Sequence, residues 1–386
     1  STPHTSIIKV LRRPLESAHC ATGPKEIGVR VAVLGAGSWG TALGYALATK
    51  GYDVAMWDID MPVLQSITAH ENTRYLPGIT LPSSMHGEPE LKAALARAQL
   101  VVFAVPSQAM RSVGKQAAPL IRDKALLCSV TKGIEVDTLM TMSEVLQDVL
   151  PQRLHSRLTF LSGPSFAVEV AREFPTAVTI AGEDAEVTSQ VQRAFHTPFL
   201  RPYVSDDVVG VEIAGCAKNV IAIACGAGDG LGYDANTRAA TITRGLAEIT
   251  RLAVARGANP LTLLGLAGVG DLVLTCSSVK SRNYRVGFGL GQGRRLDEVQ
   301  AELGQVAEGV LNAKSVKALA ERAGVEMPLC GMVYAVLYEG RDMADLRSFF
   351  AERPLKSEPE HHLGRWTRRF RRRGRRVAAG PASPDA

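Results

Sequence analysis

The stretch from residue 30 to residue 60 limits the possible fold more than any other part of this chain. It begins with a short apolar run, residues 31–34, of the length and composition of a buried strand. The glycine-rich turn GAGSWG follows at once, then a helix-forming segment without proline at residues 41–50, and then a strand-like run that ends directly before Asp58. Strand, glycine turn, helix, strand and acid within one unit of about 30 residues predict a dinucleotide-binding motif.

Each glycine of this turn has a physical role. Gly35 allows the tight turn off the strand, Gly37 lets the backbone approach a pyrophosphate, and Gly40 lets the helix pack against the sheet. The N-terminus of the following helix presents free N–H groups and a partial positive charge to that pyrophosphate.

A chain of 386 residues is too long for one ordinary core. Strand-like runs at residues 100–105, 125–130 and 158–161 alternate with helical segments, which predicts a doubly wound, mostly parallel sheet of Rossmann type with helices on both faces. From about residue 206 onward the sequence shows only long helical stretches and glycine-rich loops. We therefore expect an α/β dinucleotide-binding domain and an all-helical, substrate-binding C-terminal domain. The expected boundaries are 1–28 for a flexible N-terminal extension, 29–205 for the first domain, 206–352 for the second, and 353–386 for a flexible tail.

The basic residues are concentrated at one end. Residues 353–386 carry ten Lys or Arg against three acids, a net +7, whereas the whole chain carries +6, so the body is near −1. The body therefore offers no electrostatic reason to expect nucleic acid as a partner. We expect the Arg-rich tail to be solvated; the alternative is an anionic membrane surface contacted by Trp366 and Phe370.

Lys218 is the strongest candidate for chemistry. It lies in a segment, residues 211–225, that is apolar almost all round and is therefore expected to be a buried helix. Burial lowers the pKa of a lysine toward neutrality, which suits a general acid or base. The alternative is that Lys218 pairs with Glu212 or another carboxylate, or extends to the surface. The adjacent Asn219, taken alone, is typical of a helix-surface amide.

Other polar residues form a possible anion site. Asp271 follows flexible glycines, where it either caps a helix or partners a lysine. Ser281, Arg282 and Asn283 combine a guanidinium fork with neutral donors, an anion-binding set, although a surface loop is the alternative. Lys132 lies in a turn at the carboxyl edge of the expected sheet, where ligands bind. These residues indicate a dehydrogenase acting on a small, anionic, phosphorylated alcohol or ketone, and the histidines fit no metal spacing.

Together these motifs closely resemble the NAD(P)-dependent glycerol-3-phosphate dehydrogenases of bacterial type. The matching segments run in the family's order from about residue 31 to residue 338, and include GAGSWGTAL, YLPG, VPSQAMR, TKGIE, SGPSFAVEVA, AKNVIAI, LAGVGDLVLTC, SRNYRVG and VAEGV. The resemblance implies an oxidoreductase that interconverts dihydroxyacetone phosphate and sn-glycerol 3-phosphate for glycerophospholipid synthesis. It also implies a cytoplasmic homodimer, or a plastid-like organelle enzyme if residues 1–28 are the remnant of a targeting segment.

The resemblance assigns roles to single residues. Lys218 is expected to exchange a proton with the C2 oxygen, with Lys132, Asn219 and Asp271 as the other catalytic residues. The expected substrate-binding residues are Lys132, Gly163, Ser165, Lys218, Asp271, Ser281, Arg282 and Asn283. The expected cofactor-binding residues are Gly35, Gly37, Ser38, Trp39, Gly40, Asp58, Lys132, Ala167, Arg282, Val306 and Glu308.

One departure from the family concerns the cofactor. Members that favour NADPH often carry Arg or His just after the second strand, where this chain has Asp58, Ile59 and Asp60, with no basic residue before Arg74. A carboxylate there accepts a hydrogen bond from a ribose 2′-hydroxyl and repels a 2′-phosphate, so we expect NAD, with NADP as the alternative. Two rival functions are a dehydrogenase of small hydroxy acids and a nucleotide-sensing module without turnover.

Overall fold

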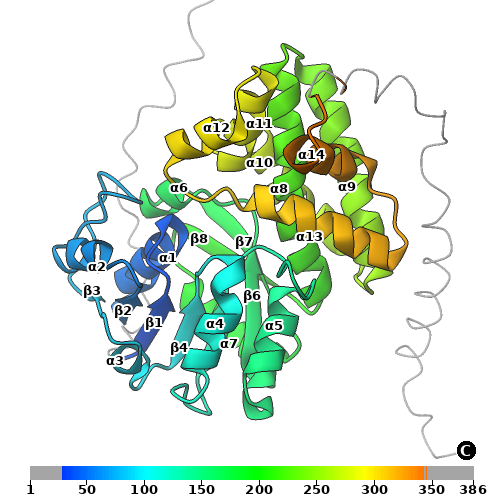
Figure 1. The fold of residues 1–386 in the computed structure, drawn as a ribbon. Helices are drawn as coiled ribbons and strands as arrows, with labels where there is room; N and C mark the ends of the chain where they lie inside the picture. Colours follow the sequence, from blue (N-terminus) through cyan, green and yellow to red (C-terminus); the bar gives the residue numbers. More distant parts are fainter. Residues whose placement is uncertain (1–27, 343–344, 346–386) are drawn as a thin grey trace, which may run out of the picture. The chain divides into compact units, whose positions relative to one another are not determined.

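The computed structural model describes residues 28–342 and residue 345, and its first part is built on one eight-stranded sheet (Figure 1). The strands, in the spatial order β3-β2-β1-β4-β5-β6-β7-β8, are β1 (Arg30–Leu34), β2 (Asp53–Trp57), β3 (Met85–Gly87), β4 (Leu100–Phe103), β5 (Leu126–Ser129), β6 (Leu158–Ser162), β7 (Thr176–Gly182) and β8 (Leu200–Ser205). All pairs from β3 to β6 are parallel, β6 and β7 are antiparallel, and β7 and β8 are parallel. The expected doubly wound, mostly parallel sheet is confirmed.

Helices cover both faces of this sheet. They are α1 (Ser38–Thr49), α2 (Met61–Thr68), α3 (Leu91–Leu95), α4 (Met110–Ala117), α5 (Met142–Val149), α6 (Ala167–Ala171) and α7 (Ala185–Phe195), with short 3₁₀ turns η1 (Ser107–Ala109) and η2 (Gln152–Arg157). In β1, Val31 and Val33 belong to the apolar core on one face, whereas Ala32 and Leu34 belong to the core on the other. A strand buried on both faces needs apolar side chains at every position, which explains the continuous apolar run in the sequence.

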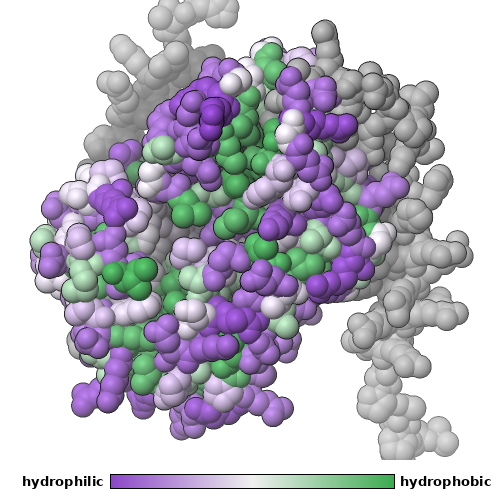
Figure 2. Space-filling view, in the orientation of Figure 1, coloured by the Kyte–Doolittle hydropathy of each residue, from purple (hydrophilic) through white to green (hydrophobic). Residues whose placement is uncertain are grey.

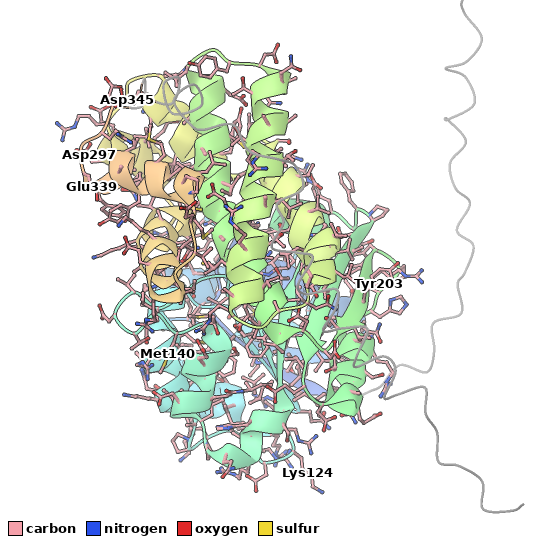
Figure 3. The ribbon with its side chains drawn as sticks, turned by 90° about the vertical axis from the view of Figure 1, so that its right-hand side faces the viewer. Lys124, Met140, Tyr203, Asp297, Glu339 and Asp345 are labelled. Atoms are coloured by element: carbon pink, nitrogen blue, oxygen red, sulfur yellow. The ribbon has the colours of Figure 1, made fainter. Side chains whose placement is uncertain are left out.

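Three strands were not predicted from the sequence. β3 has only three residues, and β7 contains three small residues and two threonines rather than a continuous apolar run. β8 is an edge strand in which buried Leu200 and Pro202 alternate with exposed Arg201 and Tyr203, and Tyr203 lies at an outer side of the protein in Figure 3. A half-exposed strand lacks the apolar continuity on which the other predictions depended.

The part of the chain after Asp206 is helical throughout the described residues. It contains α8 (Val208–Gly230), α9 (Ala235–Ala255), η3 (Pro260–Leu264), the short π-turn η4 (Leu266–Gly270), α10 (Asp271–Cys276), α11 (Arg282–Gly291), α12 (Leu296–Leu303), α13 (Glu308–Ala323) and α14 (Pro328–Tyr338). Helices α9, α10, α11, α13 and α14 all pack against α8. A Cβ at Gly226 of α8 would lie 2.0 Å from the Tyr284 carbonyl oxygen, so only glycine allows α11 to approach this closely.

Helix α8 has the length and apolarity of a membrane span, but 83% of its apolar window is buried inside the protein. Burial of this kind is the pattern of a core helix, and the packing of five helices around α8 accounts for its composition. On the face shown in Figure 2, hydrophilic side chains cover most of the surface.

The sheet and the helical part belong to one compact unit, and α8 packs directly on β6 and β7. The change from strands to helices falls where it was expected, but the boundary between 205 and 206 as a division of domains stays a prediction. Beyond residue 342 only Asp345 is described. The predicted extension, except Gly28, and the predicted Arg-rich tail with its membrane alternative lie outside the described residues.

Candidate active site

A cleft of about 1420 Å³ lies between the carboxyl edge of the parallel strands and the helical part. Its lining includes residues from the turns after β1, β2, β4, β5 and β6, and side chains from α8, α10 and α11. Ligands of doubly wound sheets bind at this edge. The cleft therefore joins the glycine turn to the polar residues of the helical part.

The glycine turn leaves space for a ligand where the sequence predicted it. Gly35 has φ +112°, and a Cβ there would lie 2.6 Å from the Ala104 carbonyl oxygen. At Gly40 a Cβ would lie 2.0 Å from the Gly35 carbonyl oxygen, whereas at Gly37 it would meet nothing within 4 Å. Gly35 and Gly40 are therefore required by the fold itself, and Gly37 faces the open cleft.

The start of α1 fits a pyrophosphate. No side chain caps this helix, so its first N–H groups have no side-chain partner. The indole Nε1 of Trp39 is buried without a hydrogen-bond partner, and Trp39 lines the cleft beside Ser38. The Ser38 hydroxyl donates to Gln305 Oε1 at 3.3 Å. A free helix N-terminus beside an unpaired donor is a suitable environment for the phosphates of a dinucleotide.

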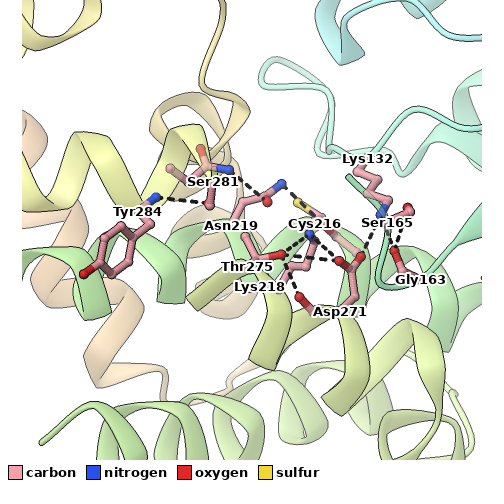
Figure 4. Close-up of polar contacts among 12 residues, drawn as sticks. Lys132, Gly163, Ser165, Cys216, Lys218, Asn219, Asp271, Thr275, Ser281 and Tyr284 are labelled. Atoms are coloured by element: carbon pink, nitrogen blue, oxygen red, sulfur yellow. Dashed lines mark hydrogen bonds and ion pairs between the residues drawn. The ribbon is translucent and has the colours of Figure 1, made fainter. Parts of the chain in front are cut away.

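Lys218, Asp271 and Lys132 meet in the cleft (Figure 4). Lys218 comes from the middle of α8, Asp271 begins α10, and Lys132 lies in the turn after β5. Lys218 Nζ is 2.8 Å from Asp271 Oδ1, and Lys132 Nζ is 2.6 Å from Asp271 Oδ2. One carboxylate therefore holds two ammonium groups from opposite sides of the cleft.

Burial and the neighbouring charges together set the pKa values of Lys218 and Asp271. Lys218 is 6% exposed, and burial lowers its pKa to about 8, against the charge of Asp271, which raises it. Burial alone would raise the pKa of Asp271, but the charges of Lys132 and Lys218 outweigh it and hold that pKa below its usual value. The carboxylate stays ionised, and Lys218 is poised to gain or lose a proton near neutral pH.

The alternative pairing of Lys218 with Glu212 is wrong. Glu212 faces α5 instead, where its carboxylate accepts hydrogen bonds from the backbone N–H of Ser143 at 2.8 Å and from its hydroxyl at 2.5 Å. Residues 212 and 218 lie six apart in α8, which is roughly 240° around the helix axis at 3.6 residues per turn, so the two side chains leave the helix in different directions.

Thr275 is a member of this centre that the sequence analysis missed. Its hydroxyl accepts a hydrogen bond from Lys218 Nζ at 2.6 Å and donates to the backbone carbonyl of Asp271 at 2.6 Å. Thr275 lies four residues after Asp271, which places both side chains on one face of α10. That spacing was the signal that could have identified it.

Ser281 and Asn283 are buried at the start of α11, so the surface-loop alternative does not describe them. The Ser281 hydroxyl caps the helix by accepting from the Tyr284 N–H at 3.2 Å. Asn283 donates to Asn219 Oδ1 at 3.0 Å and accepts from the Gly309 N–H at 2.9 Å. Asn219 is likewise buried and not a surface amide.

Arg282 differs from its two neighbours because it is exposed and lines the cleft. Its Nη1 donates to Gln305 Oε1 at 3.3 Å. Among the three predicted anion-binding residues, Arg282 is thus the exposed one, although the surrounding protein partly desolvates its guanidinium and lowers the pKa of that group.

The residues after β6 divide into two groups. Ser165 and Ala167 line the cleft as expected. Gly163 is not in the lining; its carbonyl oxygen accepts from Lys132 Nζ at 3.3 Å and from the Ser165 hydroxyl at 3.0 Å. Gly163 therefore orients Lys132 and is not itself placed to contact a substrate.

The remaining predicted cofactor residues also line the cleft, but their carboxylates are already engaged. Glu308 accepts from the Ser107 hydroxyl at 2.7 Å, and burial raises its pKa. Asp58 accepts from the Ala36 N–H at 2.6 Å and from the Asp60 N–H at 3.0 Å, so it braces the glycine turn. Val306 is a half-exposed apolar contact.

No cluster of His, Cys, Asp and Glu that could hold a metal ion occurs within residues 28–342. The arrangement instead combines a dinucleotide cleft, a buried lysine of lowered pKa and an accessible arginine. These features define a class of protein, the oxidoreductases that use a nicotinamide dinucleotide.

Comparison with known proteins gives the particular family. The family models for the N-terminus and the C-terminus of NAD-dependent glycerol-3-phosphate dehydrogenase match residues 30–188 and 207–348. The glycerol-3-phosphate dehydrogenase [NAD(P)+] of Anaeromyxobacter dehalogenans (strain 2CP-C) is 59% identical over 313 residues, which are 81% of this chain and 94% of that protein. The corresponding protein of Syntrophobacter fumaroxidans is 48% identical over 334 residues, 86% of this chain and 98% of that protein.

A crystal structure of glycerol-3-phosphate dehydrogenase from Coxiella burnetii superposes with a TM-score of 0.81 at 39% identity, covering 86% of this chain and all of that one. This chain belongs to the family of NAD-dependent glycerol-3-phosphate dehydrogenases. It is an oxidoreductase whose cofactor is NAD or NADP.

Proposed function

We propose that Lys218 is the general acid and base in the reaction of this family, the reversible reduction of dihydroxyacetone phosphate to sn-glycerol 3-phosphate. The observation that carries the proposal is the buried Lys218–Asp271 pair inside the cleft, with Nζ 2.8 Å from Oδ1 and the lysine pKa lowered to about 8. A general acid and base works best when its pKa lies near the working pH.

A bound nicotinamide ring would give or accept the hydride at C2 of the substrate. The residues of the chain supply the proton and the charges around the reacting oxygen. In reduction, Lys218 Nζ donates a proton to the C2 oxygen as the hydride reaches C2; in oxidation it takes that proton back. Lys132 adds a second positive charge beside the developing oxyanion, and Asp271 and Thr275 hold the lysine in place.

Arg282 is the proposed phosphate-binding residue. Arg282 is exposed and lines the cleft, and only its Nη1 has a described hydrogen bond, to the neutral Gln305. A planar fork of N–H donors binds phosphate in a bidentate manner. Asn283 and Asn219 are joined to each other and to Gly309, so their proposed role is to hold the start of α11 beside Lys218.

NAD is the proposed preferred cofactor, because Asp58 follows β2 at the position where a carboxylate meets the ribose hydroxyls. The proposal also includes binding of the dinucleotide by residues 29–205, binding of substrate by residues 206–352, and a cytoplasmic homodimer that supplies glycerophospholipid synthesis. Family membership supports these points. Light scattering of the purified chain tests the homodimer, and a mass corresponding to one chain would reject it.

The decisive test measures NADH oxidation with dihydroxyacetone phosphate and with unphosphorylated dihydroxyacetone. We expect turnover only with the phosphorylated substrate, and a loss of about 10²–10⁴-fold in kcat for Lys218→Ala. Lys317→Ala is a matched control, since Lys317 pairs with Glu321 on the exposed side of α13. A preference for a hydroxy acid would favour the rival dehydrogenase, and NADH binding without any turnover would favour the sensing module.

A further inference from the structure

The loop after β2 meets a second loop that comes from further along the chain. Arg74 Nη1 lies 2.5 Å from Asp60 Oδ2. Asp60 caps α2 by accepting from the Val63 N–H, and Arg74 lies over the Tyr75 ring at 5.1 Å from its centroid. Both partners of the pair line the cleft beside Asp58 and Ile59.

This contact supplies a basic group where the sequence showed only acids. Arg74 is 14 residues beyond Asp60, so its place beside the end of β2 depends on how the intervening α2 and its loop fold back. The arginine beside the end of β2 therefore comes from the loop after α2. A basic residue is usually sought in a different place, directly after β2.

With Arg74 present, the charges beside the end of β2 are more favourable for an anion than Asp58 and Asp60 alone would be. Asp60 is neutralised by Arg74, and Asp58 points its carboxylate oxygens at the N–H groups of Ala36 and Asp60. The Arg74 side chain is 58% exposed, and a guanidinium has five N–H donors, more than the Asp60 contact uses. A guanidinium is more weakly hydrated than an ammonium and presents a planar fork of N–H donors, so it is suited to bind a phosphate.

An exposed apolar side chain indicates that the adenosine end of the dinucleotide would bind at this part of the cleft. Ile59 is 87% exposed although it lines the cleft. A large apolar side chain exposed in a binding cleft indicates an apolar ligand surface, such as the face of an adenine ring. This placement rests on the proposed cofactor site, in which the adenosine ribose lies beyond β2.

We propose that Arg74 is a specificity-determining residue that binds the 2′-phosphate of NADP(H), so that this chain accepts both dinucleotides. Asp58 favours the 2′-hydroxyl of NAD(H), while Arg74 offsets the repulsion that a 2′-phosphate meets from the acids. Asp60 sets the balance, because it competes with the phosphate for the same guanidinium.

Binding of adenosine 2′,5′-bisphosphate and of ADP, measured by isothermal titration calorimetry, separates this role from catalysis. We expect Arg74→Ala to weaken the bisphosphate about tenfold or more and ADP by less than about threefold. Asp60→Asn is expected to tighten the bisphosphate selectively. The selective loss for Arg74→Ala should shrink as salt rises, because an exposed charge pair is screened.

Arg201→Ala is a matched control, since Arg201 is also exposed over a tyrosine ring, at 5.6 Å, and is not in the cleft lining. Arg74→Gln is the second variant, and melting temperatures show whether each variant is folded. If Arg74→Ala lowered the affinity for both ligands equally, or for neither, the inference about Arg74 would be overturned, but the proposed cofactor site would stand. Failure of the wild type to bind either ligand would overturn both.

Discussion

Asp271 and Lys218 form a buried ion pair although 53 residues separate them in the chain. Asp271 is 1% exposed, and its second oxygen holds Lys132. Without this carboxylate two ammonium groups would face each other in a poorly solvated cleft, which is strongly unfavourable. Asp271 is therefore both the support of the fold at this point and the group that adjusts the proton affinity of Lys218.

The pH dependence of turnover should report this pair. Reduction needs the protonated lysine, so kcat/KM for reduction is expected to fall as pH rises through about 8, whereas kcat/KM for oxidation rises through the same pH. The charge of Asp271 raises the pKa of Lys218, so Asp271→Asn should move both midpoints to lower pH. Asp297→Asn, at an exposed pair with Arg295, is the control. Midpoints unchanged in Asp271→Asn would contradict this role.

A second pH effect should appear in stability. Burial raises the pKa of Glu212 to about 7 from 4.5, against the hydrogen bonds from Ser143. Between these values the folded chain binds more protons than the unfolded chain, so the stability that this group contributes is fully present below 4.5 and is lost as pH rises through about 7. Glu212→Gln cannot ionise, and its free energy of unfolding should gain about 1–3 kcal/mol over wild type across that interval.

Denaturant unfolding at a series of pH values measures this difference. Glu186→Gln, at an exposed carboxylate of α7, should show a much smaller change. If the difference in free energy of unfolding between Glu212→Gln and wild type stayed constant with pH, Glu212 would have the same pKa in the folded and the unfolded chain, and the prediction would be rejected.

The sequence predicted the parts of the fold that depend on local pattern. The unit from β1 to β2 follows from glycine sterics and apolar runs, and the burial of Lys218 follows from the apolar helix around it. Partners brought together by the packing of distant segments were not predictable in this way. Asp271 was left open between two roles, Thr275 was missed, and Arg74 was noted only as the first basic residue after the second strand.

The glycine turn offers a test in which folding and binding separate. Gly37→Ala is expected to leave the melting temperature unchanged, because its Cβ meets nothing within 4 Å, yet to weaken NADH about tenfold or more by filling the space for the pyrophosphate. Gly40→Ala should lower the melting temperature as well, because its Cβ would lie 2.0 Å from the Gly35 carbonyl oxygen. Thermal melts and calorimetric NADH titrations measure both. Wild-type NADH affinity in Gly37→Ala would refute the proposed pyrophosphate site.

Thr275 gives the last prediction, because its hydroxyl is the second hydrogen-bond partner of the Lys218 ammonium. Thr275→Val keeps the shape of the side chain but removes the acceptor, which destabilises the buried ammonium relative to the neutral amine. We expect kcat for reduction to fall roughly tenfold, the pH midpoint to move lower, and NADH affinity to stay unchanged. Thr275→Ser retains the hydroxyl and should remain near wild type. If Thr275→Val lowered only the melting temperature and left kcat and the pH midpoint alone, Thr275 would serve the packing of α10 and not the ionisation of Lys218.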